Sequence, residues 1–253
     1  MQAPDTNWLQ AAAGERRAGL PERVAEALGR RVVAGQIAPG GSIPTEPEIQ
    51  KEFGVSRTAV REAMRLLLAK GLIETRPKTG TRVRPPEEWN VLDPEVLAWH
   101  SADNPEPQFI EDLFNMRLIF EPAAAESAAE RASPEQLRKI GEALEAMTGS
   151  SRGSRDQVEA DLAFHMAILE AGGNRLLRAL GSLIASALTV TFSLNWRARS
   201  TSLEERMDMH REVYRHIKAG KPRLAGQAMH RLISSSRSDS LTAVQRVTRK
   251  AAV

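Results

Sequence analysis

Hydrophobic positions in the first third of the chain follow the helical repeat, and glycines interrupt that repeat at short intervals. Val24, Leu28 and Val32 recur every four residues, which predicts a helix over residues 20–34 with one buried face. Pro21 suits the first turn of this helix, because the first helical N–H groups have no partner within the helix. The glycines and proline that follow end it.

Two more helices are predicted directly downstream. Thr45 is a suitable N-cap for a helix that ends at Phe53, and Glu48, three positions later, would complete a capping box. Ser56 is a suitable N-cap for the next helix, which stops before Gly71. Its inward-facing positions are predicted to be Val60, Met64, Leu67 and Leu68.

A β-hairpin is predicted after these helices. The segments LIETR and TRVRP flank the sequence PKTG, in which Gly80 is free to adopt a positive φ. The order helix, helix, short break, helix, hairpin is typical of a winged helix-turn-helix. We assign this domain to residues 20–86 and expect residues 1–19 to form a flexible tail without a secretory signal.

The remainder shows no alternating pattern and no hairpin signal, so it is predicted to be all helical. We assign residues 87–106 to a linker and a first helix, and residues 107–248 to an antiparallel bundle. Helices are predicted at Pro94–Ala102, Pro107–Ala132, Pro134–Met147, Asp156–Ala171, Asn174–Trp196, Ser202–Ala219 and Pro222–Thr248. The fold class is therefore mostly α, with a winged helix-turn-helix followed by an all-α bundle.

Composition narrows the class of protein. With 253 residues, of which 42% are hydrophobic and 26% charged, the chain can form two globular domains. No apolar run approaches the roughly 18 residues that a membrane span requires. The absence of cysteine excludes disulfides and thiolate metal sites and is typical of a reducing compartment. We therefore expect a cytoplasmic protein.

The net charge of +3 is unevenly distributed. Residues 20–86 hold 12 lysines and arginines against 7 acidic residues, a net charge of +5. Residues 87–253 hold 21 against 23, a net charge of −2. A small basic domain joined to a nearly neutral one indicates a domain that binds a polyanion and a second domain with another role. A solvated surface of mixed charge is the alternative.

The third helix offers side chains that suit the major groove. Arg57 and Arg61 lie four residues apart, so both guanidinium groups project from one helix face. A guanidinium matches the O6/N7 edge of guanine, and this contact discriminates against a wrong base by about 1–3 kcal/mol. The hydroxyls of Ser56 and Thr58 suit phosphate oxygens, whereas Arg65 is expected to reach only the backbone. A solubilising helix face is the alternative interpretation.

The segment EIQKEFGVSRTAVREAMRLLLAKGLI resembles the DNA-binding domain of the GntR transcription regulators. Nearly every position of that family's pattern is filled between Pro44 and Val83. The resemblance implies base contacts by the two arginines named above. It also implies a hairpin tip, Thr79-Gly80, in the minor groove, beside which we expect Lys78 to contact phosphate. Pro47 departs from the pattern, because many relatives have an arginine there.

A polar group within the predicted bundle suggests a metal site. Asp161 and His165 are four residues apart, so a carboxylate and an imidazole share one helix face. A divalent metal with His210 as third ligand would satisfy both groups. The alternative is a hydrogen-bonded pair on a helix surface. Zinc is favoured by the ligand types, with nickel or manganese as the other candidates.

The same residues resemble the FCD effector domain of the FadR subgroup of GntR regulators, as does RLIFEPAAAESAA at residues 117–129. Many members of that domain bind a metal through one aspartate and three histidines, which implies this role for Asp161, His165 and His210. The fourth position falls on Leu232, so either three protein ligands hold the metal and leave positions for water and effector oxygens, or the metal is lost. His230 lies two residues earlier, about 200° round the helix, and should face away.

Arg117 is the candidate for binding an effector carboxylate, because a buried guanidinium needs a partner and its fork matches a carboxylate. An internal salt bridge with Glu121 is the alternative. Asn195 and Trp196 are candidates to line the same pocket, and a place in the hydrophobic core is the alternative for the tryptophan. The segment EWNVLDPEVLAWH resembles the one after the hairpin in the aldonate-responsive members of the subgroup, which implies a sugar acid of galactonate type.

The pattern as a whole predicts a homodimeric DNA-binding regulator, expected to be a repressor, that binds an inverted-repeat operator and responds to a small carboxylate. The effector alternatives are lactate, a dicarboxylate or an acyl compound. A metal-dependent hydrolase is the alternative from another class, although HExxH and nucleophile-elbow patterns are missing. A third is an architectural DNA-binding protein that binds no ligand.

Overall fold

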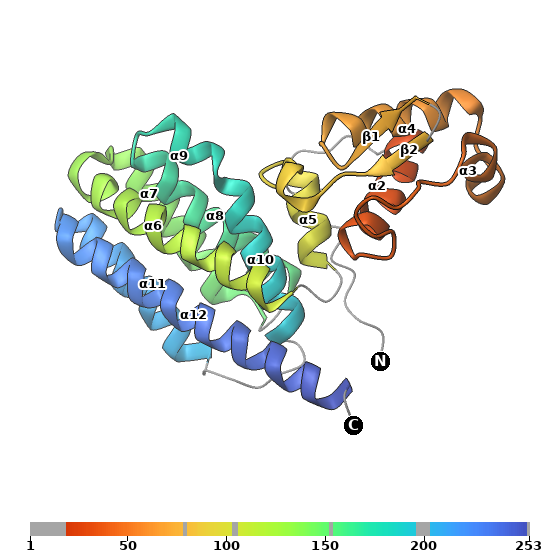
Figure 1. Cartoon of the computed structure of the whole chain (residues 1–253). Helices are drawn as coiled ribbons and strands as arrows, with labels where there is room; N and C mark the ends of the chain where they lie inside the picture. The colour runs from red at the N-terminus through yellow and green to blue at the C-terminus, as the bar shows by residue number, and fades with distance from the viewer. Residues whose placement is uncertain (1–18, 78–79, 103–105, 152–153, 196–202, 252–253) are drawn as a thin grey trace. The chain divides into compact units, whose positions relative to one another are not determined.

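The computed structural model describes residues 19–77, 80–102, 106–151, 154–195 and 203–251 of the chain. The chain divides into two compact units, one within Gln10–Asp103 and the other within Asn104–Val253 (Figure 1). Each unit is mostly helical, and the first also contains a two-stranded sheet. The mostly α fold class predicted from the sequence is confirmed.

The first unit begins with the three predicted helices, α2 (Leu20–Val33), α3 (Glu46–Phe53) and α4 (Arg57–Ala69). The capping box of α3 is present, since the carboxylate of Glu48 accepts from both the backbone N–H and the hydroxyl of Thr45. Ser56 caps α4 by accepting from the backbone N–H of Ala59 at 3.2 Å. These local bonds fix the start of both helices, because they satisfy N–H groups that the helix itself leaves free.

The hairpin follows as predicted. β1 (Ile73–Arg76) pairs antiparallel with β2 (Gly80–Val83), with Ile73 opposite Val83. Gly80 has a φ of +77°, which a residue with a side chain rarely adopts, so glycine is required at the start of β2. Lys78 and Thr79, which join the strands, lie outside the described residues.

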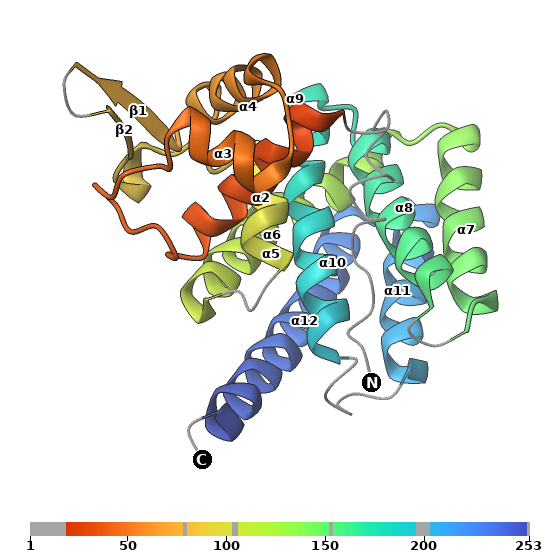
Figure 2. The same ribbon diagram turned by 90° about the vertical axis from the view of Figure 1, so that its right-hand side faces the viewer.

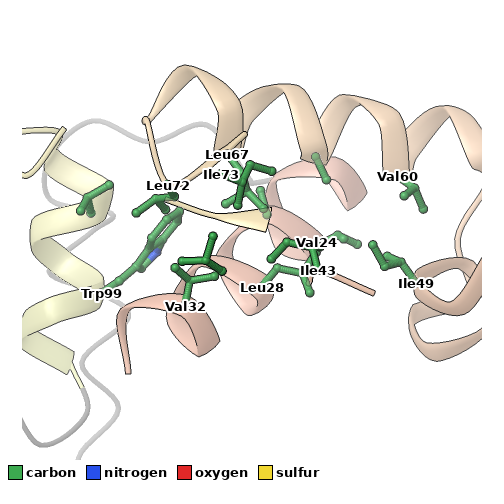
Figure 3. Packing of buried hydrophobic residues seen from close by; sticks show 14 residues of the cluster. Val24, Leu28, Val32, Ile43, Ile49, Val60, Leu67, Leu72, Ile73 and Trp99 are labelled. Atoms are coloured by element: carbon green, nitrogen blue, oxygen red, sulfur yellow. The ribbon is translucent and has the colours of Figure 1, made fainter. Parts of the chain in front are cut away.

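A short 3₁₀ turn, η1 (Pro86–Glu88), leads to α5 (Pro94–Ala102), which packs on α2 and completes the core of this unit. Figure 3 shows side chains from α2, α4, β1 and α5 converging there, with Trp99 at the α5 end. Trp99 approaches α2 at Gly29, where an added Cβ would lie 2.3 Å from a ring carbon of the tryptophan. Lys70, at the end of α4, binds the carboxylate of Asp93 at 2.8 and 2.9 Å and so ties α4 to the start of α5.

One predicted core position is wrong. Leu68 is 40% exposed, whereas Val60 and Leu67 are fully buried, as is Ala63. Leu68 lies about 100° round the helix from Leu67, which places it at the edge of the buried stripe. Met64 is half-buried and packs against the core.

The second unit is a helical bundle. Its elements are α6 (Pro107–Arg131), α7 (Pro134–Gly149), α8 (Arg155–Ala171), α9 (Arg175–Ala179), α10 (Gly181–Asn195), α11 (Leu203–Lys218) and α12 (Pro222–Ala251). α6 packs against α12 and α8, α7 packs against α8, and α11 packs against α12 (Figures 1 and 2). None of the helices within the described ranges is both long and apolar enough to span a bilayer.

The helix predicted over Asn174–Trp196 is divided into α9 and α10, which corrects the prediction. Leu180 ends the first piece in a tight turn, with its N–H bonded to the carbonyl of Leu177 at 3.0 Å. Gly181 starts the second piece against Met166 of α8, where an added Cβ would lie 2.4 Å from the sulfur. The break lets the chain pass close to α8, a tertiary contact that the sequence periodicity does not reveal.

Candidate functional site

The first candidate site is the exposed surface of α4. Ser56, Arg57, Thr58, Arg61 and Arg65 are all exposed. Since α4 buries its opposite side in the core of the unit, this surface is the part of the helix that can enter a DNA groove.

Two of these arginines share one acidic partner. Arg57 Nε donates to Glu46 Oε2 at 3.0 Å, and Arg61 Nε donates to both oxygens of Glu46 at 3.2 and 3.3 Å. The hydrogen bond from Arg57 is the main cause that lowers the pKa of Glu46 below its usual value. Arg65 instead pairs with Glu62 at 3.1 Å. The carboxylate of Glu46, at the first position of α3, therefore draws the two candidate base-reading side chains together.

A groove of about 480 Å³ runs between α3, α4 and the hairpin. Arg61 and Glu46 line it from the helices, and Thr75, Gly80 and Thr81 line it from the strands. The groove thus brings α4 and the described part of the hairpin tip, Gly80, to one surface. Lys78 and Thr79 belong to the same predicted site but lie outside the described residues.

The second candidate site is a polar cluster in the bundle. Asp161 and His165 of α8 and His210 of α11 each offer one ligand atom, and these atoms lie within 4.8 Å of one another. Asp161 Oδ1 is 3.3 Å from Nε2 of His165 and 3.3 Å from Nε2 of His210. Both histidines are buried, whereas the aspartate side chain remains 18% exposed. The structure therefore brings together the three residues proposed from the sequence.

The hydrogen bonds that the two histidines make through Nδ1 orient their rings so that Nε2 is available to a metal. His210 Nδ1 lies 2.7 Å from the backbone carbonyl of Arg206, which can only accept, so Nδ1 carries the proton. His165 Nδ1 lies 2.5 Å from Glu121 Oε2. Both rings consequently present Nε2 to Asp161, the arrangement in which metal-binding histidines are commonly held. The donor set of two imidazoles and one carboxylate suits zinc.

The charges of this cluster stabilise one another. Burial by itself lowers the pKa of His165, but Glu121 and Asp161 outweigh that effect and raise it to about 9. Burial likewise raises the pKa of Glu121, but the positive charges of Arg117 and His165 lower it to about 2. The carboxylate of Glu121 is therefore ionised at neutral pH and accepts hydrogen bonds on both oxygens.

Arg117 extends the cluster along α6. It is 1% exposed, and its Nε donates to Glu121 Oε1 at 2.5 Å. The internal salt bridge between Arg117 and Glu121 is therefore present. It uses only part of the guanidinium, because Nη1 is buried and has no hydrogen-bond partner among the described residues.

Other predicted site residues lie elsewhere or outside the description. His230 is exposed and lies 3.4 Å from the hydroxyl of Ser234, so it faces away from the cluster as expected. Leu232, at the position of the family's fourth ligand, is buried and apolar. Asn195 is the last residue of α10, but its side chain is not described, and Trp196 lies outside the described residues.

Two acidic residues of these sites are not indicated by the sequence. The sequence patterns indicate Glu121 only as a salt-bridge partner of Arg117 and do not single out Glu46. The available signal for Glu121 was the i, i+4 spacing to a predicted buried arginine. Its contact with His165, 44 residues away, has no signal in the sequence.

Known proteins resemble both units. Residues 20–83 match the family described as bacterial regulatory proteins, gntR family, and residues 112–235 match the FCD domain. The chain is 33% identical over 215 residues to the galactonate operon transcriptional repressor of Escherichia coli (strain K12). The aligned region covers 85% of this chain and 94% of the relative. It is 34% identical over 192 residues to the HTH-type transcriptional regulator YieP of the same strain, covering 75% and 82%.

A solved structure described as Lar of Listeria monocytogenes superimposes with a TM-score of 0.61 and covers 89% of this chain and 98% of its own. With 16% identity, this similarity concerns the fold alone. The relatives by sequence are transcription regulators and not enzymes, so the hydrolase alternative is rejected. The chain belongs to the GntR family of bacterial DNA-binding transcription regulators, with an FCD domain as its second unit.

Proposed function

We propose that this regulator is a homodimeric repressor that binds an inverted-repeat operator and is released from it by a sugar acid of galactonate type. The support is the similarity to the galactonate operon transcriptional repressor over 94% of that relative. A dimer follows from the geometry of recognition, because two helix-turn-helix domains related by a two-fold axis match the two halves of an inverted repeat.

In the proposed complex, α4 enters the major groove with its N-terminal end first. Arg57 and Arg61 contact guanine edges, because both are exposed and lie on one face of the helix. Ser56, Thr58 and Arg65 contact phosphates and set the orientation of the helix. The hairpin tip Lys78-Thr79-Gly80 follows the minor groove, and Gly80 permits a close approach because it has no side chain.

In the bundle, Asp161, His165 and His210 would hold a divalent ion, for which zinc is the first candidate. Three protein ligands leave coordination positions for the oxygens of a hydroxy acid, and Leu232 supplies no fourth ligand. When bound, the ion would supply a positive charge that attracts a carboxylate and its neighbouring hydroxyl.

The structural observation that supports a carboxylate effector is the buried guanidinium of Arg117. Its Nη1 has no hydrogen-bond partner among the described residues, and a buried donor left in that state costs free energy. A carboxylate is the natural partner, since guanidinium and carboxylate match in charge and geometry. Asn195 and Trp196, at the end of α10, are proposed to line the same pocket.

Binding of the effector would favour the arrangement of the two DNA-binding units that does not fit the operator. The change in operator affinity is limited by the ligand's difference in affinity between the two arrangements. Lactate, a dicarboxylate or an acyl compound in place of the sugar acid would leave this mechanism intact and change only the pocket chemistry.

The experiment is fluorescence anisotropy with a duplex from the DNA upstream of the protein's own gene. Zinc-loaded protein is titrated first without ligand and then with D-galactonate, D-gluconate, L-lactate or succinate. We expect salt-sensitive, sequence-specific binding that D-galactonate weakens by at least about tenfold, within the usual range of allosteric coupling. Release by another acid alone would reassign the effector, and indifference to all four acids would refute the sugar-acid proposal.

A further inference from the structure

We propose that Glu121 is a positioning residue that serves both recognition groups of the bundle at once, because its two carboxylate oxygens hold Arg117 and His165. This inference rests on the proposed function, in which Arg117 binds the effector and His165 binds the metal. It adds a residue that contacts neither ligand and yet orients the side chains that bind both.

The geometry of Glu121 divides its two oxygens between two helices. Oε1 accepts from Nε of Arg117 on the same helix, α6, and Oε2 accepts from Nδ1 of His165 on α8, both at 2.5 Å. All three side chains are at least 97% buried, so water does not compete for these bonds. A buried carboxylate with both oxygens paired to donors has a fixed orientation.

For His165, the contact selects one tautomer. The carboxylate of Glu121 is already paired with the guanidinium of Arg117 through Oε1, so Oε2 is placed to accept from the imidazole, and the ring carries a proton on Nδ1. When the ring gives up its second proton to bind a metal, the lone pair therefore lies on Nε2, which is the atom facing Asp161 at 3.3 Å. Without this acceptor, the ring could carry its proton on Nε2, where it would block a metal.

For Arg117, the contact fixes the direction of the fork. The bond to Glu121 uses Nε, and Nη1 is a buried terminal nitrogen without a hydrogen-bond partner among the described residues. The negative charge of Glu121 also makes the buried guanidinium tolerable, since an unpaired buried charge is strongly destabilising. The same carboxylate therefore orients the guanidinium, so that it can bind the carboxylate of an effector.

A carboxylate is required because both of its oxygens accept. A glutamine of the same shape has one acceptor and one donor, so it can satisfy only one of the two N–H groups. Its NH₂ group would either face the N–H of Arg117 or bond to Nδ1 of His165 and force the unfavourable tautomer. Glu121→Gln should therefore damage at least one of the two recognition groups without changing the size of the side chain.

The test compares Glu121→Gln with Glu111→Gln in the full-length protein. Glu111 lies on the same helix and pairs with Arg237 at 3.8 Å, outside the polar cluster. Zinc affinity is measured by competition with a chromogenic chelator, and D-galactonate affinity is measured by calorimetry on zinc-loaded protein. We expect Glu121→Gln to weaken zinc binding by about 10- to 100-fold, the usual effect of losing a partner of a metal ligand, and to weaken galactonate binding. Glu111→Gln should leave both affinities unchanged.

The outcomes separate this inference from the proposed function. If the wild type binds both ligands and Glu121→Gln binds them equally well, Glu121 has only a structural role and the inference is wrong. If the wild type binds no zinc, the proposed metal site fails and the positioning role toward His165 fails with it. If Glu121→Gln does not fold, ¹⁵N NMR of the wild type decides. A protonated Nδ1 and a zinc-bound Nε2 at His165 support the inference, and the opposite tautomer overturns it.

Discussion

Arg57 donates a hydrogen bond from Nε to the carboxylate of Glu46, and its side chain nevertheless stays largely exposed. The Nε–Oε2 distance is 3.0 Å, and the arginine side chain is 68% exposed. Arg61 contacts the same carboxylate, also through Nε. Bidentate recognition of guanine can use the terminal nitrogens, so the contact with Glu46 is compatible with base contact. Glu46 thus restricts the flexibility of two side chains that are proposed to read the operator.

Replacing Glu46 with glutamine is expected to relax sequence discrimination. The loss of a negative charge near DNA strengthens binding to every duplex, but the freed arginines also reach wrong bases and phosphates. The ratio of specific to nonspecific affinity should fall by about two- to fivefold, the effect expected from loosening an exposed ion pair. Glu62→Gln is the matched control, because Glu62 pairs with Arg65 on the same helix. Anisotropy on matched and scrambled duplexes measures both ratios, and equal changes in the two variants would contradict the role of Glu46.

Arg57→Ala and Arg65→Ala should have different effects on DNA binding. Arg57→Ala removes a base contact, so it should cost about 1–3 kcal/mol on the operator and relax the preference at one base pair. Arg65→Ala removes a phosphate contact, so it should weaken binding to all sequences alike and reduce the salt slope by about one. Titrations at several salt concentrations with operator and mismatched duplexes separate the two effects. If Arg57→Ala shifts both duplexes equally, Arg57 does not read the sequence.

The first unit could be predicted in detail because its signals are local. The capping hydrogen bonds at Thr45 and Ser56 join residues three positions apart, and Gly80 adopts a positive φ at its own position. Such features are encoded by neighbouring residues, so a pattern of capping residues and glycines is sufficient to locate them.

Two features that depend on distant contacts were not predictable, although the pairing of His210 with the Asp161 and His165 face was. The break before Gly181 depends on its approach to Met166 of another helix, and the position of Glu121 depends on His165 across the bundle. The cluster of Asp161 and His165 was found because its members share a helix face. Its connection to Arg117 needed the three-dimensional packing of α6 against α8.

The close approach of Trp99 to Gly29 predicts a stability effect in the first unit. An added methyl group at Gly29 would lie 2.3 Å from the ring of a tryptophan that is 4% exposed, so α5 must shift away from α2. Gly29→Ala should lower the free energy of unfolding by about 1–3 kcal/mol, the usual cost of overpacking. The measurement is urea unfolding followed by tryptophan fluorescence. Gly149→Ala is the control, because its Cβ meets no atom within 4 Å, and it should change stability by less than about 0.5 kcal/mol. A stable Gly29→Ala protein would show that α5 is loosely packed.

Removal of the metal tests the proposed bundle site apart from any effector. Asp161 faces Nε2 of both histidines, so Asp161→Asn removes the anionic ligand while it keeps the size of the side chain. We expect about one zinc per wild-type chain after dialysis, and less than about 0.1 in the variant. His230→Gln is the control, since His230 is exposed and outside the cluster, and it should retain the ion.

Zinc that binds only the folded state stabilises that state by about 4 kcal/mol when the zinc concentration is a thousandfold above its dissociation constant. A chelator should therefore lower the melting temperature of the wild type and of His230→Gln but not that of Asp161→Asn. If the chelator affected all three proteins alike, the ion would be bound elsewhere, and the pairing of Asp161 with the two imidazoles would be only a buried polar contact.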